Sequence, residues 1–293
     1  MTHNYSPGMY DISEEEYFAL PYISNSDLKL LRRSPAHYYA ARLDPKRVEK
    51  EPTDALIAGK MLHTAILEPQ LFDERYIVLP ADAPRRPTPA QINAKNPSPE
   101  TVHSVAWWSA WNAQAEGRVL VTSENKIKYM AAAKAVRGHP DLSGFLESGH
   151  AEKTFIDVHE ETGIVRRSRI DWITTIGNST VIIDFKSAED ARPYPFSRAC
   201  YNYDYFEQAA YYCSVVKGSG YADPELFLFG VFEKEPPYGL MLYQATEEAM
   251  LRATLSYENS LQIAKRCIDS NNWPCYSTDI QPVDYPSWAK EPA

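Results

Sequence analysis

The chain has 293 residues, of which 44% are hydrophobic and 12% aromatic, and it carries a formal net charge of −9 at pH 7. This length and composition allow one large domain with a packed core, or a core domain with a substantial insertion. The negative charge argues against a protein that coats nucleic acid along its whole surface, but it leaves open an enzyme with a local basic groove.

What the sequence lacks excludes several classes of protein. It has no long apolar run and no signal-peptide pattern, so we expect no membrane partner and a cytoplasmic location. The cysteines form no C-x-x-C pair, which favours reduced thiols over a zinc ribbon or a disulfide framework. The phosphate-binding loop GxxxxGK(S/T) is also absent, so we expect no nucleotide cofactor.

The first part of the chain shows helical patterns. Ser26 is expected to cap a helix that stops before Ser34, and a second helix fits Thr53 to Leu67. Within this second helix Gly59 and His63 are four residues apart and therefore share one face. A glycine there permits the close approach of another backbone, which makes His63 a candidate metal ligand or phosphate contact, although a lone histidine on a half-apolar helix is more often structural.

Prolines are concentrated between residues 80 and 100, which predicts a loop. Helical patterns then resume to about residue 147, and Trp107, Trp108 and Trp111 occur there at helical spacing. Tryptophans can stack on bases, but this spacing favours positions in the core. Basic residues gather in patches that are most simply solvated surface charge: Lys46, Arg47 and Lys50, then Arg85 and Arg86, then Arg166, Arg167 and Arg169.

The hydrophobic period changes at about residue 152, where strands replace helices. A continuous β-branched run at 181–183 predicts a central strand that is covered on both faces. Helices are expected again at 203–217 and 246–270. The chain is therefore predicted to be an α/β protein with a central mixed β-sheet flanked by helices, with strands at 153–159, 165–173, 180–185, 226–233 and 240–243.

The stretch that says most about function ends at Asp184-Phe185-Lys186. The same Asp-x-Lys or Glu-x-Lys spacing recurs at 27–29, 44–46 and 124–126, but the first and last of these lie in helical patterns and the second contains a proline. Only Asp184 and Lys186 follow an apolar strand, where residues two apart share a face, and only they have a further acid, Asp171, on the preceding strand.

This combination is typical of a metal-dependent phosphodiesterase. Asp171 and Asp184 would bind Mg²⁺, for which Mn²⁺ should substitute, and the carbonyl of Phe185 could add a ligand. Lys186 would position the attacking water or help to deprotonate it, and its charge would offset the charge that develops in the transition state. Glu152, at the start of the first predicted strand, is a candidate third carboxylate, although an isolated glutamate at a strand end is often only solvated.

The order of these motifs resembles that of the RecE (exonuclease VIII) nuclease domain, in the RecB-like branch of the PD-(D/E)xK superfamily. The resemblance runs from about residue 23 to 273. It rests on six motifs in the family order: Ser-Pro-Ala-His-Tyr at 34–38, Gly-Lys-Met-Leu-His at 59–63, Ala151-Glu152, Arg169-Ile170-Asp171, Asp184-Phe185-Lys186, and Gln208 with Tyr212 four residues later.

The resemblance implies a restriction-endonuclease-like core in a single nuclease domain, with a helical part at 1–150 and the catalytic sheet and C-terminal helices at 151–275. It implies that Asp171, Asp184 and Lys186 form the catalytic core. His63 and Glu152 would join them as active-site residues and metal ligands. Arg169, Gln208 and Tyr212 would support the site or contact DNA, although core packing is the simpler reading of tyrosines at this helical position.

The resemblance also implies an activity: Mg²⁺-dependent digestion of linear duplex DNA from 5′ ends, which leaves 3′ overhangs for a RecT-like annealing partner in phage recombination. A homo-oligomeric ring would confine basic residues to a central channel and so reconcile DNA binding with the acidic total charge. Some RecB-like nucleases hold an iron–sulfur cluster with a cysteine before the histidine motif. Here the first cysteine is Cys200, beyond the core motifs, so no cluster is expected.

Two alternatives remain open from the sequence. One is an endonuclease, or a single-strand or flap nuclease, of the same superfamily, because a fold does not fix its substrate. The other is a DNA-end-binding scaffold whose nuclease site is vestigial. The presence together of Asp171, Asp184 and Lys186 argues against the scaffold.

Overall fold

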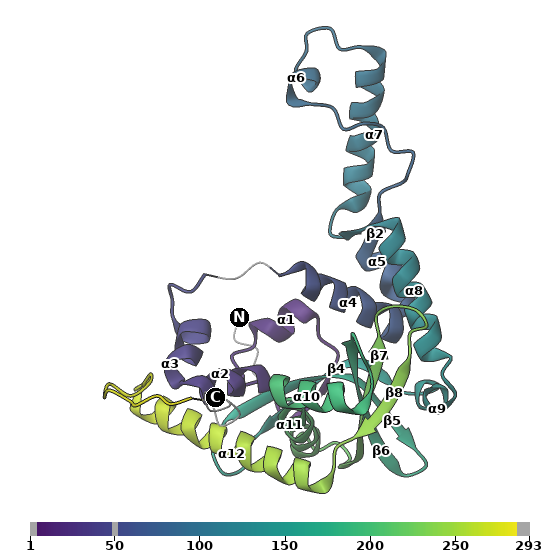
Figure 1. Ribbon diagram of the computed structural model, residues 1–293. Helices are drawn as coiled ribbons and strands as arrows, with labels where there is room; N and C mark the ends of the chain where they lie inside the picture. Colours follow the sequence, from purple (N-terminus) through teal and green to yellow (C-terminus); the bar gives the residue numbers. More distant parts are fainter. Residues whose placement is uncertain (1–4, 49–51, 286–293) are drawn as a thin grey trace, which may run out of the picture.

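The computed structural model describes residues 5–48 and 52–285, and a six-stranded sheet is at its centre (Figure 1). The strand order is β1-β4-β5-β6-β7-β8, in which only the β6–β7 pair is parallel. The predicted α/β fold with a mixed sheet is therefore confirmed. The strands are β1 (Gly8–Tyr10), β4 (His150–Val158), β5 (Val165–Ile176), β6 (Ser179–Ala188), β7 (Pro224–Glu233) and β8 (Leu240–Gln244).

Helices cover both faces of this sheet. On one face α2 (Asn25–Arg33), α11 (Tyr205–Gly218) and α12 (Glu247–Ser270) enclose a core to which β6 contributes Ile182. On the other face α4 (Asp54–Leu67) and α8 (Ser123–Arg137) pack over Ile183 and Phe185 of the same strand. Alternate residues of β6 thus enter opposite cores, as the β-branched run predicts.

Side-chain caps set where several helices begin. Thr53 accepts from the backbone N–H of Leu56 at the start of α4, and Thr246 caps α12 in the same way. The prediction that Ser26 caps the helix that stops before Ser34 is wrong, because this helix is α2 and its cap is Ser24. Asp27 accepts from the Ser24 backbone N–H at 2.9 Å, so serine and aspartate form a capping box, and the helix begins two residues earlier than expected.

The parallel pair β6–β7 requires a long crossover, and two helices supply it. They are α10 (Pro193–Tyr203) and α11, where the sequence predicts a single helix from Tyr203 onwards. Asp204 separates them, in the left-handed region at φ 59°. Aspartate tolerates this conformation better than most residues, so the chain turns sharply without a glycine.

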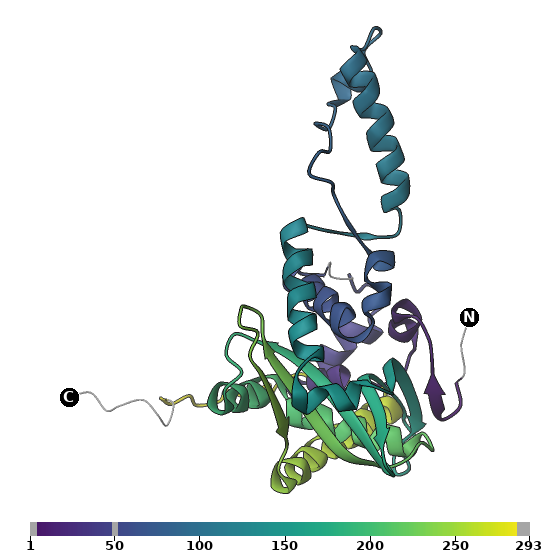
Figure 2. The same ribbon diagram turned by 90° about the vertical axis from the view of Figure 1, so that its right-hand side faces the viewer.

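An arm projects from the sheet and its helices, as both views show (Figure 2). It holds α6 (Pro89–Ile92) and α7 (Pro99–Ala115), so the proline-rich segment is a loop interrupted by one short helix. Two short parallel strands, β2 (Tyr76–Val78) and β3 (Val119–Val121), join the arm to the rest. The other helical segments are α1 (Glu14–Ala19), α3 (Pro35–Tyr38), η1 (Tyr39–Leu43), η2 (Pro69–Leu71), α5 (Phe72–Arg75), α9 (Pro140–Ser143) and η3 (Gly144–Leu146).

The tryptophans of α7 lie in this arm, so their predicted place in the core is wrong. Trp107 and Trp111 stack with ring centroids 6.4 Å apart, and the guanidinium of Arg86 lies 4.4 Å from the centroid of Trp108. Trp108 also donates to the carbonyl of Pro84 at 3.0 Å. These half-exposed side chains hold the arm together and, within the part of the chain described, belong to none of the clusters around the sheet.

Two arginines expected at the surface are buried. Arg166 donates to Asp157 at 2.9 Å, and Arg167 donates to the backbone carbonyl of Leu20 at 2.8 Å. Arg166 also donates to Ser214 of α11 at 3.1 Å, so it ties that helix to the sheet, and Arg167 ties the N-terminal segment to it. Neither arginine is surface charge. Arg85 and Arg86 are exposed on the arm, whereas Lys50 lies outside the described residues. Among the helices described, none is both long and apolar enough to cross a membrane.

Candidate active site

Three carboxylates stand in a row across adjacent strands. The pairs Ala151↔Trp172 and Lys153↔Ile170 place Glu152 of β4 opposite Asp171 of β5. Asp184 of β6 follows one position beyond the pair Trp172↔Ile183, which places it next to Asp171 in the same row.

The strand ladder changes at this row. The backbone N–H of Phe185 donates to the carboxylate of Asp171 at 2.8 Å. On the neighbouring strand Glu152 has φ 53°, an unusual conformation for a residue that is not glycine. Irregular strand positions of this kind redirect side chains beside functional sites. Arg169 then fixes the redirected glutamate, because its Nε lies 2.8 Å from Oε2 of Glu152.

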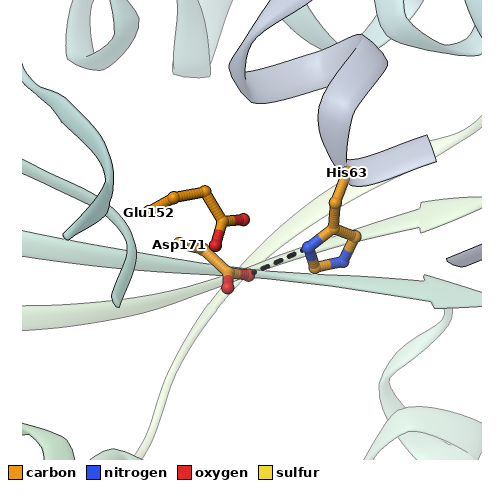
Figure 3. Close-up of side chains that lie close together, drawn as sticks. All are labelled: His63, Glu152 and Asp171. Carbon is orange, nitrogen blue, oxygen red and sulfur yellow. Dashed lines mark ion pairs between the residues drawn. The ribbon is translucent and has the colours of Figure 1, made fainter. Parts of the chain in front are cut away.

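His63 completes a cluster with two of these acids (Figure 3). Its Nδ1 lies 3.6 Å from Oδ2 of Asp171, and it comes from α4, on the opposite side of the site from α11. One ligand atom from each of His63, Glu152 and Asp171 lies within 4.8 Å of the other two. All three residues are half-buried, so the cluster is open to solvent on one side.

Asp184 belongs to a second group, with Lys186 and Gln208. Nζ of Lys186 lies 2.5 Å from Oδ2 of Asp184, whose side chain is only 2% exposed. Gln208 of α11 bridges the two, because it accepts from Lys186 at 3.0 Å and donates to Asp184 at 3.1 Å. Tyr212, one helical turn further on, shares a hydrogen bond with Gln208. Gln208 therefore contacts the lysine strand directly, and Tyr212 contacts Gln208.

Burial and neighbouring charges shift the proton affinities of the two groups. Burial raises the pKa of Asp171 to about 7, with His63 opposing the shift and the Asp184 and Glu152 carboxylates adding to it. For Lys186, burial lowers the pKa, but the carboxylates of Asp184 and Asp171 outweigh this and raise it. Lys186 is accordingly an ammonium at neutral pH, suited to holding an anion rather than to taking up a proton.

The cluster of His63, Glu152 and Asp171 fits a divalent cation. Two carboxylate oxygens suit Mg²⁺ or Mn²⁺, and an imidazole nitrogen suits Mn²⁺ better. Asp171 bears a raised pKa that a bound cation would lower, which is the expected linkage between metal and ligand. The motif spacing predicts that Asp171 and Asp184 bind the metal together, but the carboxylate of Asp184 is engaged by Lys186 and Gln208 and lies outside this cluster.

Other features of the site differ from those expected from the sequence. A Cβ added at Gly59 would have nothing within 4 Å, so this glycine does not mark the close approach that we expected. Tyr205 belongs to none of the sequence motifs, yet the centroid of its ring lies 4.5 Å from Nζ of Lys186. Arg169 holds Glu152 and also donates to the carbonyl of Ile12 at 3.0 Å, so its described contacts are within the protein.

A family model matches residues 24–285 of the chain, and its family is described as a PDDEXK-like domain of unknown function, DUF3799. This protein belongs to that family. The match spans the histidine of α4, the three acids and the lysine, in accord with the PD-(D/E)xK superfamily expected from the motifs. No curated protein matches the sequence.

A solved structure confirms the fold. A protein from Eubacterium rectale, provisionally called an exonuclease, is 13% identical and superposes with a TM-score of 0.56, over 94% of this chain and 97% of that one. At this identity the similarity concerns the fold alone. Another structure, SSO0001, is 16% identical over 76% of this chain and 91% of that one, but its TM-score of 0.30 is too low to carry an argument.

Proposed function

We propose that this protein is a metal-dependent exonuclease that hydrolyses linear double-stranded DNA. The observation that carries the proposal is the ligand cluster of His63, Glu152 and Asp171 beside the ion pair of Asp184 and Lys186. A cation site next to a fixed ammonium is what hydrolysis of a phosphodiester by water requires. The PDDEXK-like family assignment supports the same class of reaction.

Each residue has a role that follows from its contacts. His63, Glu152 and Asp171 would hold the metal, Mg²⁺ or in its place Mn²⁺, which when bound supplies a Lewis acid and an acidified water. Lys186, held by Asp184 and Gln208, donates to the scissile phosphate or to the attacking water. Because its pKa is raised, it acts as a positive charge that stabilises the transition state and not as the base.

The finer features of the proposal rest on the RecE-like order of the six motifs. They are digestion from 5′ ends, 3′ overhangs passed to a RecT-like annealing partner in phage-type recombination, and a homo-oligomeric ring around the DNA. The acidic total charge of −9 supports the ring, because a ring lets a few cations face the DNA while the outer surface stays acidic.

Linear and covalently closed circular duplexes of one sequence, incubated with Mg²⁺ or with EDTA, test the proposal. We expect the wild type to degrade the linear DNA but not the closed circle, and to do so in Mg²⁺ but not in EDTA. Asp184→Ala and Lys186→Ala should degrade neither DNA. Asp279→Ala, at an exposed residue beyond α12, is the matched control and should behave as the wild type. End-labelled substrates then give the polarity.

Other outcomes point elsewhere. Cutting of the closed circle would overturn the exonuclease claim in favour of an endonuclease. If neither DNA is degraded in any metal while DNA ends are still bound, the protein is a scaffold with a vestigial site.

A further inference from the structure

Two tyrosine rings lie next to each other between Lys186 and the protein surface. The ring of Tyr205 receives the ammonium of Lys186, with 4.5 Å from Nζ to the ring centroid. The ring of Tyr203 is next, with its centroid 5.7 Å from that of Tyr205 and the two planes inclined by 32°. Tyr205 is half-buried, whereas Tyr203 is 60% exposed. One face of aromatic surface therefore extends outward from the proposed site of hydrolysis.

The left-handed turn at Asp204 creates this arrangement. It ends α10 at Tyr203 and begins α11 at Tyr205, so the two rings come from different helices and lie side by side. The carboxylate of Asp204 is itself held by α2, through Lys29 at 3.3 Å and Arg32 at 3.1 Å. Ion pairs from a third helix thus fix the turn that presents Tyr203.

A cation accompanies the exposed ring. Nζ of Lys29 lies 5.9 Å from the centroid of Tyr203, and the Lys29 side chain is 48% exposed. An aromatic platform next to a solvent-exposed ammonium is the combination that binds single-stranded nucleic acid, because the ring stacks on a base while the cation contacts a phosphate. A single exposed tyrosine would need no explanation, but this one packs against Tyr205, whose ring receives the ammonium of Lys186.

We infer that Tyr203 and Lys29 form a binding subsite for one DNA strand next to the scissile phosphate, with Tyr203 stacked on a base and Lys29 on the backbone. The inference rests on the proposed nuclease function and deepens it, because it names the strand-binding residues that no motif includes. Inside a duplex the neighbouring bases cover both faces of each base, so the ring can stack only on an unpaired base or on the last pair of an end. The subsite is assigned to an unpaired strand at the end being digested, where the ring reaches one base and Lys29 the backbone of the same strand.

Binding of a fluorescein-labelled single-stranded oligonucleotide, measured by anisotropy in EDTA, tests the subsite without any hydrolysis. Tyr203→Ala should weaken binding about tenfold, the loss typical of one stacked base, and Tyr203→Phe should bind as the wild type does. The logarithm of the binding constant falls linearly with the logarithm of the salt concentration. Lys29→Gln should make this slope less steep by about 0.7, the value for one phosphate contact on a single strand.

Tyr201→Ala is the matched control for the ring. Tyr201 is 83% exposed and lies on α10 two residues before Tyr203, so it points to the other side of the helix, where it lines a hollow with Ala249 and Arg252. It should bind DNA as the wild type does. Thermal melts should agree between the tyrosine variants and the wild type, because the rings of Tyr201 and Tyr203 are exposed. Lys29→Gln removes one of the two ion pairs of Asp204 and should melt close to the wild type, because Arg32 still holds that carboxylate.

The results separate this inference from the proposed function. If Tyr203→Ala binds single strands as tightly as the wild type, or if Tyr201→Ala loses as much affinity, the subsite is overturned even when metal-dependent digestion is observed. If digestion fails but binding depends on Tyr203 and Lys29 as described, the subsite stands and the nuclease proposal falls.

Discussion

Gln208 holds both members of the ion pair between Lys186 and Asp184: its oxygen lies 3.0 Å from Nζ of Lys186 and its nitrogen 3.1 Å from Oδ1 of Asp184. One amide therefore fixes the direction of the ammonium and of the carboxylate at the same time. Without this contact the flexible side chain of Lys186 could adopt several rotamers. The glutamine of α11 is accordingly a positioning residue for the lysine of β6.

Replacing Gln208 by alanine should lower kcat about 10-fold to 100-fold with a smaller change in KM, because supporting hydrogen bonds of this kind orient the reacting groups. Steady-state digestion of linear DNA measures both constants. Gln262→Ala is the control, since Gln262 makes an exposed contact with Glu161 on the surface of α12. An unchanged kcat in Gln208→Ala would show that Lys186 needs no such support.

Removing the charge of Asp171 should stabilise the metal-free protein at alkaline pH. The ordinary pKa of the carboxyl is 3.8, whereas in the folded protein burial raises it to about 7. Between these values the unfolded chain has released a proton that the folded protein keeps, so stability falls as the pH rises from about 4 to about 7. Asparagine cannot be ionised, so Asp171→Asn does not lose stability as the pH rises. In EDTA at pH 8 it should melt several degrees above the wild type.

Thermal melts at a series of pH values check this expectation. The gap between Asp171→Asn and the wild type should close as the pH falls towards about 4, where the aspartate is neutral in both states. Asp279→Asn, an exposed substitution, should follow the wild type throughout. A variant that melts below the wild type at pH 8 would mean that the carboxylate is charged and well paired in the folded protein.

Substituting His63 should affect one metal more than the other. Imidazole is a better ligand for Mn²⁺ than for Mg²⁺, which prefers oxygen and retains its waters. In His63→Ala the Kd for Mn²⁺ should rise more than tenfold, and the Kd for Mg²⁺ should rise less. Isothermal titration measures both. His103→Ala, at an exposed histidine of the arm, should leave both constants unchanged. Unchanged constants in His63→Ala would remove His63 from the ligand set.

Two glycines should respond in opposite ways to the same substitution. A Cβ at Gly230 of β7 would lie 3.0 Å from the buried ring of Phe185, between Asp184 and Lys186, so Gly230→Ala should destabilise the protein by about 1–3 kcal/mol. At Gly59 a Cβ meets nothing within 4 Å, and alanine is the better helix former, so Gly59→Ala should stabilise by about 0.5–1 kcal/mol. Denaturant unfolding measures both. If Gly230→Ala stabilises the protein, the ring of Phe185 can move aside for the added methyl group without cost.

The sequence was sufficient to locate the sheet and the row of acids. The strand that carries Asp184 and Lys186 is recognisable because its apolar run is continuous, and residue spacing alone then places both side chains on one face. Thr53 and Thr246 likewise mark in the sequence where the helices that they cap begin. These features depend on local chemistry, which a sequence displays directly.

The rest depends on contacts between distant segments. Which acid meets His63 is decided by the packing of α4 and by the unusual backbone of Glu152, and neither has a local signal. Arg166 and Arg167 look like surface charge until Asp157 and the carbonyl of Leu20 are brought to them. In the arm the tryptophans show the helical spacing of core residues, because they pack against one another as a core would.

The claim on which the account depends is that His63, Glu152 and Asp171 bind the cation that drives hydrolysis. Titrating metal-free protein with Mn²⁺ while following both binding and digestion of linear DNA tests it most directly. We predict that the two curves share one midpoint, and that Asp171→Asn loses binding and digestion together. Digestion that persists in EDTA, or wild-type Mn²⁺ affinity in Asp171→Asn, would contradict the account.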